Sequence, residues 1–457
     1  MAKGTRPGRV LLLLFFGVLM GALDIAIVGP ALPAIGQSFG VSAKDLAWVF
    51  TIYVLFNVVG VPLMSKLADR VGRRAVYVAD VALFGVGSIA VAAAPSFWML
   101  LVGRAMQGFG AGGIFPVATA VVGEVFPPER RGRALGLLGS VFGIAFLVGP
   151  VLGGALLLAS WHWLFIINVP VAAILAASAL RLLQDGRPAT RRPFDLAGMG
   201  VLGVLLGAVV FGLSEINARS LFTSLTSVQV WLPLLLALGL APAFWYVERG
   251  AKDPVVRVDL LSSRQVVLAS TLAIGAGLGE AGAVFFPSMA QSAFEVSHST
   301  ASFMLLPMMI ALGMGSPVVG RLLDRMGSRA VVFVSAALLT AGMVGIGFFA
   351  TSLAGYFAAS VLVGFGLAGV LGAPLRYIML GEAGPSEKAS AQGLLTVFTS
   401  IGQLTGGAVI GAVATSTGGG TTGFQAAFLV LGAVALIITA LSTKLKNHEE
   451  ELATIRR

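Results

Sequence analysis

Long apolar segments of the sequence contain ionisable side chains, among them Asp24, Arg104 and Glu280. Asp24 falls about 14 residues into the first such segment, Arg104 about seven residues into the fourth and Glu280 about 15 residues into the ninth, and each segment is long enough to cross a bilayer. An ionisable group in hydrocarbon costs several kcal/mol and is by default a functional candidate. These three residues are therefore the first candidates for chemistry in this chain.

Asp24 and Arg104 are expected at the same depth in a membrane. At 1.5 Å per residue, Asp24 lies roughly 21 Å from one surface and Arg104 roughly 10 Å from the other, in a core about 30 Å thick. A carboxylate that faces a guanidinium there could bind and release a proton as its surroundings change. The alternative is a fixed ion pair that only joins two helices.

Glu280 follows Gly277-Leu278-Gly279, where close approach of the backbone could admit a ligand. One interpretation is a site in a cavity that binds a cation or a second proton. The other is a carboxyl group that is hydrogen-bonded to a neighbouring helix. Asp80, near the start of the third apolar segment, is expected to belong to a network of loop residues rather than to the cavity.

Few other residues offer chemistry. The chain has no cysteine, and its three histidines, His162, His298 and His448, are far apart. This pattern argues against disulfides and against metal centres built from thiolates or imidazoles. The glycines do not form a phosphate-binding loop, which needs a strand before it and a soluble helix after it. We expect neither a metal nor a cofactor.

The composition indicates an integral membrane protein. The 457 residues are 57% hydrophobic and 11% charged, with 60 glycines. Apolar runs of about 20 residues recur along the chain. The first run continues through Ile35 without a cleavage-like site, so a retained helix is expected rather than a signal peptide. Fourteen membrane spans are predicted, at 10–36, 45–65, 75–95, 97–123, 134–160, 163–183, 195–215, 229–248, 265–290, 299–319, 329–350, 354–380, 389–415 and 423–443.

The charge distribution predicts the orientation. Of the 30 Lys and Arg residues, 26 fall in the termini and in alternate loops, whereas only Lys44 and Arg219 fall in the opposite loops. Because positive residues accumulate in cytoplasmic loops, both termini are predicted to be cytoplasmic, in a protein of the cell (inner) membrane. The net charge of +10 reflects this bias, and loops this short argue against a nucleic-acid partner.

The chain carries an internal repeat. Residues 61–76 and 316–331 are near copies 255 positions apart, and Gly108-Phe109-Gly110 recurs as Gly364-Phe365-Gly366. Six predicted spans on each side match, and the two spans in between match neither half. The sequence therefore predicts an all-α integral membrane protein with two six-helix pseudo-symmetric bundles and two inserted helices. The predicted boundaries are 1–183 for the first bundle, 184–264 for the linkers and inserted helices, and 265–457 for the second bundle and tail.

Five motifs resemble signatures of the major facilitator superfamily. They are 66–74 (KLADRVGRR), 104–108 (RAMQG), 149–154 (GPVLGG), 23–33 (LDIAIVGPALP) and 161–170 (WHWLFIINVP). The third resembles an antiporter signature, and the last two resemble the fourteen-helix drug:proton antiporter branch. The resemblance implies a transporter rather than an enzyme, one that works by alternating access and exchanges amphipathic, often cationic drugs for protons.

The repeated loop is expected to be part of a gate. Gly72 permits a sharp turn, so that Asp69 can meet Arg73 or the start of a neighbouring helix. The resemblance implies a latch that stabilises the state closed to the cytoplasm. The alternative is that the arginines only set the topology. The residues assigned to the gating loops are Asp69, Arg70, Gly72, Arg73, Glu124, Asp324 and Arg325.

Glycine pairs four residues apart predict close helix packing in the fifth and thirteenth spans. Because small residues at this spacing let helices approach, these two spans are expected to form a sliding seam between the bundles. Pro150 removes a backbone hydrogen bond and allows a bend. The seam residues predicted in the fifth span are Gly149, Pro150, Gly153 and Gly154.

The expected cavity is mostly apolar, which suits an amphipathic small molecule better than a sugar. A proton-coupled drug exporter is the favoured function. A lipid or lysophospholipid transporter on the same fold and, from another class, a membrane receptor or enzyme are the alternatives. The expected partners are the substrate, protons and the bilayer, and the protein is expected to be monomeric. The candidate lining residues are Asn57, Gln107, Phe285, Phe286 and Gln403.

Overall fold

The computed structural model describes residues 7–41, 43–184, 196–216, 223, 226–251, 262–384 and 387–455. Every secondary-structure element in these ranges is a helix. The helices of the first half are α1 (Pro7–Phe39), α2 (Ala43–Val71), α3 (Arg73–Ala92), α4 (Phe97–Val125), α5 (Pro128–Leu157), α6 (Trp163–Ile166) and α7 (Asn168–Leu182). Those that follow are α8 (Leu196–Ser214), α10 (Val228–Gly250), α11 (Arg264–Phe294), α12 (His298–Phe303), α13 (Leu306–Phe349), α14 (Leu353–Val370), α15 (Ala373–Glu382), α16 (Lys388–Ser416), α17 (Gly420–Ser442) and α18 (His448–Ile455).

Twelve helical segments of the described chain are long and apolar enough to cross a membrane. The prediction of an all-helical membrane protein is therefore confirmed, whereas fourteen spans are not recovered by this measure. The predicted spans 299–319 and 329–350 lie in one segment, Thr300–Phe349. In place of the predicted span 195–215 stands a shorter apolar helix, Ala197–Leu213.

Gly327 interrupts α13, which is 44 residues long. A straight helix of this length would measure about 66 Å, twice the hydrocarbon core. Gly327 has φ 77° and ψ 170°, outside the helical region, and Gly72, which precedes α3, has φ 110°. A positive φ at both positions requires glycine. The two halves of the repeat thus use the same residue for the same sharp turn.

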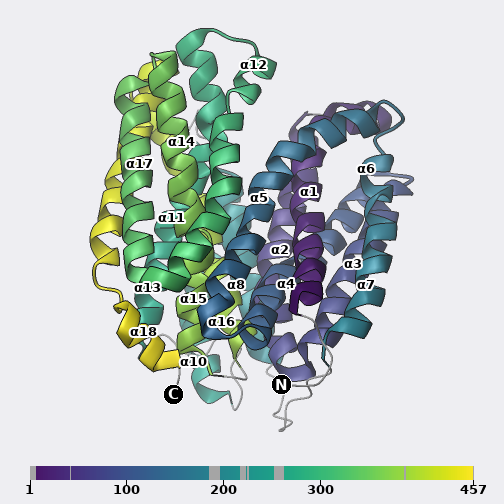
Figure 1. Ribbon diagram of the computed structural model, residues 1–457. Helices are drawn as coiled ribbons and strands as arrows, with labels where there is room; N and C mark the ends of the chain where they lie inside the picture. The colour runs from purple at the N-terminus through teal and green to yellow at the C-terminus, as the bar shows by residue number, and fades with distance from the viewer. Residues whose placement is uncertain are drawn as a thin grey trace.

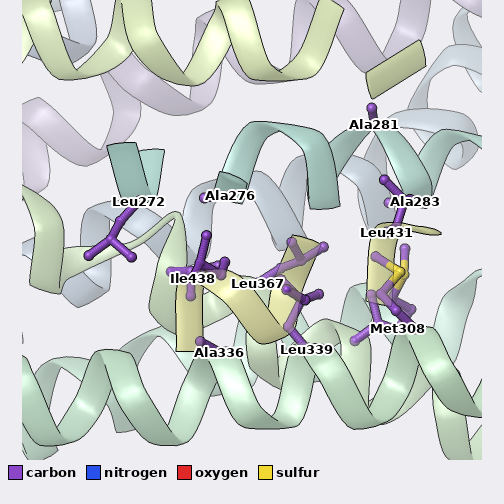
Figure 2. Close-up of a cluster of buried hydrophobic side chains, with 14 of the residues drawn as sticks. Leu272, Ala276, Ala281, Ala283, Met308, Ala336, Leu339, Leu367, Leu431 and Ile438 are labelled. Atoms are coloured by element: carbon purple, nitrogen blue, oxygen red, sulfur yellow. The ribbon is translucent and has the colours of Figure 1, made fainter. Parts of the chain in front are cut away.

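The helices form two bundles that lie side by side (Figure 1). One contains α1 to α7, with a buried core that includes Tyr77, Phe84 and Leu138. The other contains α11 to α17, and Figure 2 shows part of its core, where Leu272, Leu339 and other side chains of α11, α13, α14 and α17 meet. Because lipid is as apolar as leucine, such bundles depend on close van der Waals packing and polar contacts between helices.

Both ends of the described chain lie at the same end of the molecule, which we call the basal end (Figure 1). Helix α1 begins there, and α18 lies across the second bundle at this end. The turn at Gly327 also lies at this end, because Gly327 packs against His448 of α18.

The inserted helices α8 and α10 pack against each other and cover one side of the line between the bundles. Leu202 and Leu206 of α8 share a buried cluster with Val58 and Val61 of α2 and Val397 of α16. Only 11% of the α10 span is buried. Helix α8 thus bridges the two bundles, while α10 stays on the outside.

Helix α18 caps the restart of α13 after Gly327. The backbone N–H and the hydroxyl of Ser328 donate to the Glu451 carboxylate, at 3.0 and 2.5 Å, and Glu451 is 6% exposed. The Lys446 ammonium pairs with Glu382 of α15 in the same region. The C-terminal helix is therefore a structural part of the second bundle.

Glu451→Ala is expected to lower the melting temperature of the purified protein and to make α18 more sensitive to protease. The substitution leaves the buried backbone N–H of Ser328 without an acceptor, which costs about 1–3 kcal/mol. Glu449→Ala changes an exposed acid on the same helix and serves as the control. Equal melting temperatures and equal cleavage rates for the two variants would contradict the capping role.

Candidate functional site

Asp24 lies at the centre of a buried polar network in the first bundle. The Arg104 guanidinium donates through Nη1 to Asp24 Oδ2 at 2.5 Å. Gln107 Nε2 and Asn168 Nδ2 both donate to Asp24 Oδ1 at 3.1 Å. Asp24, Arg104 and Gln107 are 0% exposed. The carboxylate thus joins α1 to α4 and α7, and the two residues predicted to share a depth form an ion pair.

Arg104 has a second set of contacts around this pair. Its Nε donates to the carbonyl of Val49 at 3.0 Å, and its Nη1 also donates to Gln107 Oε1 at 2.9 Å. Its guanidinium carbon lies 4.4 Å from the centre of the Tyr53 ring. Its Nη2 is buried without a hydrogen-bond partner in the described part of the chain. Nη2 of Arg104 can therefore donate a hydrogen bond to another acceptor if its neighbours move.

A cavity of about 450 Å³ lies between the two bundles. Residues of α1, α2, α4 and α5 line it on one side, and residues of α11, α13, α14, α15 and α16 on the other. Its volume is in the range of small-molecule sites. Gly21, Ala22 and Ile25 of α1 line the cavity, but Asp24 is not among the described lining residues. The ion pair therefore lies behind the cavity wall, inside protein rather than against lipid.

Tyr53 stands between the cavity and the ion pair. It lines the cavity, its ring covers the Arg104 guanidinium, and it is only 1% exposed. Tyr53 was not among the residues predicted from the sequence, because a tyrosine in an apolar span gives no signal by itself.

The predicted cavity residues divide into two groups. Asn57, Gln403 and Glu280 line the cavity. Gln107 lies instead in the Asp24 network. No hydrogen bond joins Glu280 to another residue of the described chain, so the interpretation of Glu280 as a carboxyl bonded to a neighbouring helix does not describe its position.

The prediction that Phe285 and Phe286 line the cavity is wrong. Phe286 is 0% exposed and packs against Tyr356 and Phe428 in the core of the second bundle. Phe285 packs on the same core, with its ring 6.3 Å from that of Phe424. The physical reason is the helical period: the face of α11 that carries Glu280 turns away from positions five and six residues later.

Arg376 is a charged cavity residue that the sequence analysis missed. It lies on α15 and lines the cavity, with its guanidinium carbon 4.0 Å from the centre of the Phe115 ring of the other bundle. Its Nη1 donates to Gln392 Oε1 at 3.4 Å, and it attracts Glu280 electrostatically. The criterion that singled out Asp24 and Glu280, an ionisable residue inside a predicted span, applies to Arg376 as well and would have found it.

Asp80 lies in the interior of the first bundle rather than in a loop network. It is 0% exposed, and neither carboxylate oxygen has a hydrogen-bond partner in the described residues. Its carboxyl group packs against Gly113 of α4, where a side chain would not fit. The expectation that it joins the loop residues is therefore corrected.

Asp69 joins the two bundles at the basal end. Its carboxylate accepts from the backbone N–H of Ala389 at 3.1 Å and from the backbone N–H and hydroxyl of Ser390, both at 2.8 Å. Arg73 donates to it at 3.1 Å and also pairs with Glu124. A carboxylate at the start of a helix is stabilised by the unpaired N–H groups and by the helix dipole. Asp69 thus caps α16 of the opposite bundle.

Asp324 makes the corresponding contact in the other direction. It accepts from the backbone N–H groups of Gly132 and Arg133 at 2.8 and 2.9 Å, in the first turns of α5. Of the other residues predicted for the gating loops, Gly72 makes the turn before α3, Arg70 is half-buried and Arg325 is exposed. Each copy of the repeated aspartate therefore binds the other bundle.

The close seam between the bundles differs from the prediction. Gly149 and Gly153 of α5 lie against Ala26 and Ile27 of α1, within the first bundle, and a side chain at Gly154 would meet open space. The side chain of Pro150 lies outside the described part of the chain. In the second bundle, Gly402 and Gly406 of α16 pack on α11. The predicted seam between the fifth and thirteenth spans is therefore wrong.

The bundles instead approach each other through the basal half of α5 and the first half of α13. Gly136 faces Ser316 and Gly320, and Gly143 faces Gly313, at distances that leave no room for a Cβ atom. Glycine spacing predicts that α5 packs closely on two sides, but it does not identify the partner on each side.

Further hydrogen bonds join the two bundles at the basal end. Besides those of Asp69 and Asp324, the Lys388 ammonium donates to the carbonyl of Gly123 at 3.0 Å, and the Tyr377 hydroxyl donates to the carbonyl of Pro128 at 3.3 Å. These contacts hold the basal ends of the two bundles together.

Comparisons with known proteins agree with this arrangement. Residues 14–279 and 266–455 match the family model described as Major Facilitator Superfamily. The chain is 34% identical over 394 residues to the uncharacterized MFS-type transporter YfiU of Bacillus subtilis (strain 168), which covers 84% of this chain and 76% of that protein. It is 31% identical over 345 residues to Multidrug resistance protein 3 of the same strain, over 75% of this chain and 67% of that protein.

Two further comparisons concern a second bacterium and a solved structure. Multidrug resistance protein Stp of Mycobacterium tuberculosis (strain CDC 1551 / Oshkosh) is 31% identical over 406 residues, 87% of this chain and 74% of that protein. The crystal structure of the human organic anion transporter MFSD10 (TETRAN) has a TM-score of 0.72 at 20% identity, over 96% of this chain and all of that one, which shows a shared fold. With its membrane-crossing helices, its two bundles and the central cavity, the chain belongs to the Major Facilitator Superfamily of membrane transporters.

Proposed function

We propose that this transporter exports amphipathic small molecules in exchange for protons, by alternating access of the central cavity. The observation that carries the proposal is the Asp24–Arg104 ion pair, which is fully buried, held by three donors and separated from the cavity by Tyr53. Burying two charged groups costs desolvation free energy, so a charge pair inside a membrane span is a candidate for a functional role. The relatives named as multidrug resistance proteins, at 31% identity, support drugs as the exported class.

The proposed cycle uses Asp24 as the proton carrier. When the cavity faces outside, a proton binds to Asp24 and removes the negative charge that Arg104, Gln107 and Asn168 contact. The links from α1 to α4 and α7 weaken, so the bundles can rearrange and open the basal end. The proton then leaves to the cytoplasm, the Asp24–Arg104 pair forms again, and substrate taken from the cytoplasm is carried outward.

The proposed topology has fourteen spans with both termini in the cytoplasm. Its support is the interruption of α13 at Gly327, which divides a helix too long for one span, together with the short apolar helix α8. The boundaries 1–183, 184–264 and 265–457 remain our proposal for the two bundles and the insert. With the basal end at the cytoplasm, this structure corresponds to the state closed on the inside.

Tyr53→Ala is expected to let protons leak through the transporter without substrate, because it opens a path between the cavity and Asp24. Removal of the ring also uncovers the guanidinium of Arg104. Tyr53→Phe keeps the ring and is expected to leak no more than the wild type. The measurement is the decay of an imposed pH gradient in proteoliposomes without substrate. Equal decay for Tyr53→Ala and the wild type would refute this role of Tyr53.

The proposed function is tested by transport in proteoliposomes that hold the purified protein. An imposed pH gradient is expected to drive substrate uphill against the direction of proton flow, and collapse of the gradient by an ionophore is expected to stop it. The panel contains cationic, zwitterionic, neutral and lipid substrates. Transport that runs only downhill and ignores the gradient would overturn the proposal of proton antiport.

A further inference from the structure

We infer that the central cavity binds amphipathic zwitterions, with the cationic group of the ligand at Glu280 and its anionic group at Arg376. The inference deepens the proposed function, on which it rests for the assignment of the cavity as the transport site. It names a narrower ligand class than amphipathic small molecules in general, and it follows from the charges that line the cavity.

The described lining of the cavity carries one acid and one base. These are Glu280 of α11 and Arg376 of α15, and every other described lining residue is uncharged. The formal charge of the lining is therefore balanced. A simple cation would be attracted by Glu280 and repelled by Arg376. A simple anion would be attracted by Arg376 and repelled by Glu280.

Both charged groups have hydrogen-bonding capacity that the protein does not use. No hydrogen bond or ion pair connects Glu280 to the rest of the described chain, although Arg376 attracts it electrostatically. Arg376 Nε is buried without a partner in the described residues, and Nη1 makes one long bond of 3.4 Å to Gln392. Charged groups left in this way are costly, and a ligand with an ammonium and a carboxylate could satisfy both.

The surroundings of Arg376 favour an anionic group that approaches the edge of its guanidinium. Its guanidinium carbon lies 4.0 Å from the centre of the Phe115 ring, an arrangement in which the aromatic ring covers one face. The N–H groups at the edge remain suited to a carboxylate, which arginine can bind with two parallel hydrogen bonds. Phe115 belongs to the first bundle, so an anion held at Arg376 would lie where the two bundles meet.

The rest of the lining accommodates the apolar part of such a ligand. Phe142, Met309 and Leu312 line the cavity together with Phe115. Aromatic rings and a flexible methionine adapt to ligands of different shape. The cavity thus combines one positive and one negative contact with an apolar wall, which is the pattern that a zwitterionic amphiphile matches.

The test uses three matched probes: a naphthyl amino acid, its methyl ester and its N-acetyl derivative. The first is a zwitterion, the second has only the positive charge, and the third has only the negative charge. The amino acid is prepared with different spacers between its charged groups, and the spacer that binds best is used for the set. Affinities for the purified protein are measured by calorimetry without a pH gradient.

The zwitterion is expected to bind roughly tenfold or more tightly than either derivative, because each derivative leaves one buried charge without a partner. Arg376→Gln should abolish the preference over the ester and keep the preference over the N-acetyl form. Glu280→Gln should abolish the preference over the N-acetyl form and keep the preference over the ester. Glu449→Ala changes an exposed acid on α18, outside the cavity, and should leave both preferences intact. Arg376→Lys keeps the charge and should retain part of the preference.

Wild-type protein that binds the ester as tightly as the zwitterion would overturn the inference, and so would both preferences surviving in Arg376→Gln and Glu280→Gln. Arg376→Gln should still bind the methyl ester, and Glu280→Gln should still bind the N-acetyl derivative. This retained binding shows that each variant is folded. These affinities do not depend on proton coupling. A failure of antiport would therefore leave the selectivity intact, and a failure of the selectivity would leave antiport intact.

Discussion

Asp24→Asn is expected to abolish transport driven by a pH gradient while substrate still binds to the purified protein. Asparagine keeps the shape of the side chain and accepts a hydrogen bond, but it cannot carry a proton. Binding should persist because Asp24 lies behind the cavity wall and does not line it. The measurements are uphill transport in proteoliposomes and equilibrium binding of the same substrate.

Asp24→Asn leaves Arg104 buried without its ion-pair partner, and a control must separate this effect on stability from the effect on transport. Loss of one partner of a buried ion pair typically costs 3–5 kcal/mol, so Asp24→Asn should lower the melting temperature. The double variant Asp24→Asn with Arg104→Gln removes the unpaired charge and should recover part of the stability without recovering transport. Undiminished uphill transport in Asp24→Asn would contradict the role of Asp24 as the proton carrier.

Replacement of Asp69 by asparagine is expected to open the basal end, and the double variant with Asp324→Asn should open it further. Asp69 accepts three hydrogen bonds from Ala389 and Ser390, and Asp324 accepts two from Gly132 and Arg133. Hydrogen bonds to a charged group contribute about 1.5–3 kcal/mol each, so their loss should shift the equilibrium between closed and open states by roughly tenfold or more. Turnover should fall more than the affinity for substrate.

Because the sequence contains no cysteine, a single introduced cysteine can report this shift specifically. Ser65 is 0% exposed and lies against Gly393 of the other bundle, so a maleimide should label Ser65→Cys slowly in the closed state. Asp69→Asn should raise the labelling rate, whereas Arg325→Gln, a change at an exposed position of the other loop, should not. Equal labelling and an unchanged maximal transport rate in Asp69→Asn would argue against the latch.

Several features of the fold and of the site could be predicted because they follow from depth or from backbone geometry. The depth of a residue in a span follows from its distance to the span end, and this places Asp24 beside Arg104. Gly72 and Gly327 occupy corresponding positions of the repeat, and both have positive φ. Asp69 reaches the start of a neighbouring helix, as expected from its position in a short loop.

The direction in which a side chain points around its helix could not be predicted. Helix α11 is rich in small and apolar residues on every side, so its sequence does not distinguish the face at Glu280 from the face at Phe286. The actual faces depend on which helices surround α11. Phe286 therefore lies in the core although it is close to Glu280 in the sequence.

The sequence also could not predict which helix packs on each glycine-rich face or which residues the single polar side chains contact. Gly149 and Gly143 belong to one helix, but the first packs on α1 and the second on α13. Asn168 and Arg376 acquire their roles only when distant helices meet, at Asp24 and at Phe115 respectively. Such assignments require the arrangement of the bundles, which local spacing does not contain.

The most direct test of the central claim is the release of protons when substrate binds to the purified protein in weakly buffered detergent solution. If Asp24 exchanges its proton as the bundles respond to substrate, the wild type should release close to one proton for each substrate molecule bound, and Asp24→Asn should release none. Substrate binding without proton release by the wild type across the accessible pH range, or equal release by both proteins, would contradict the account.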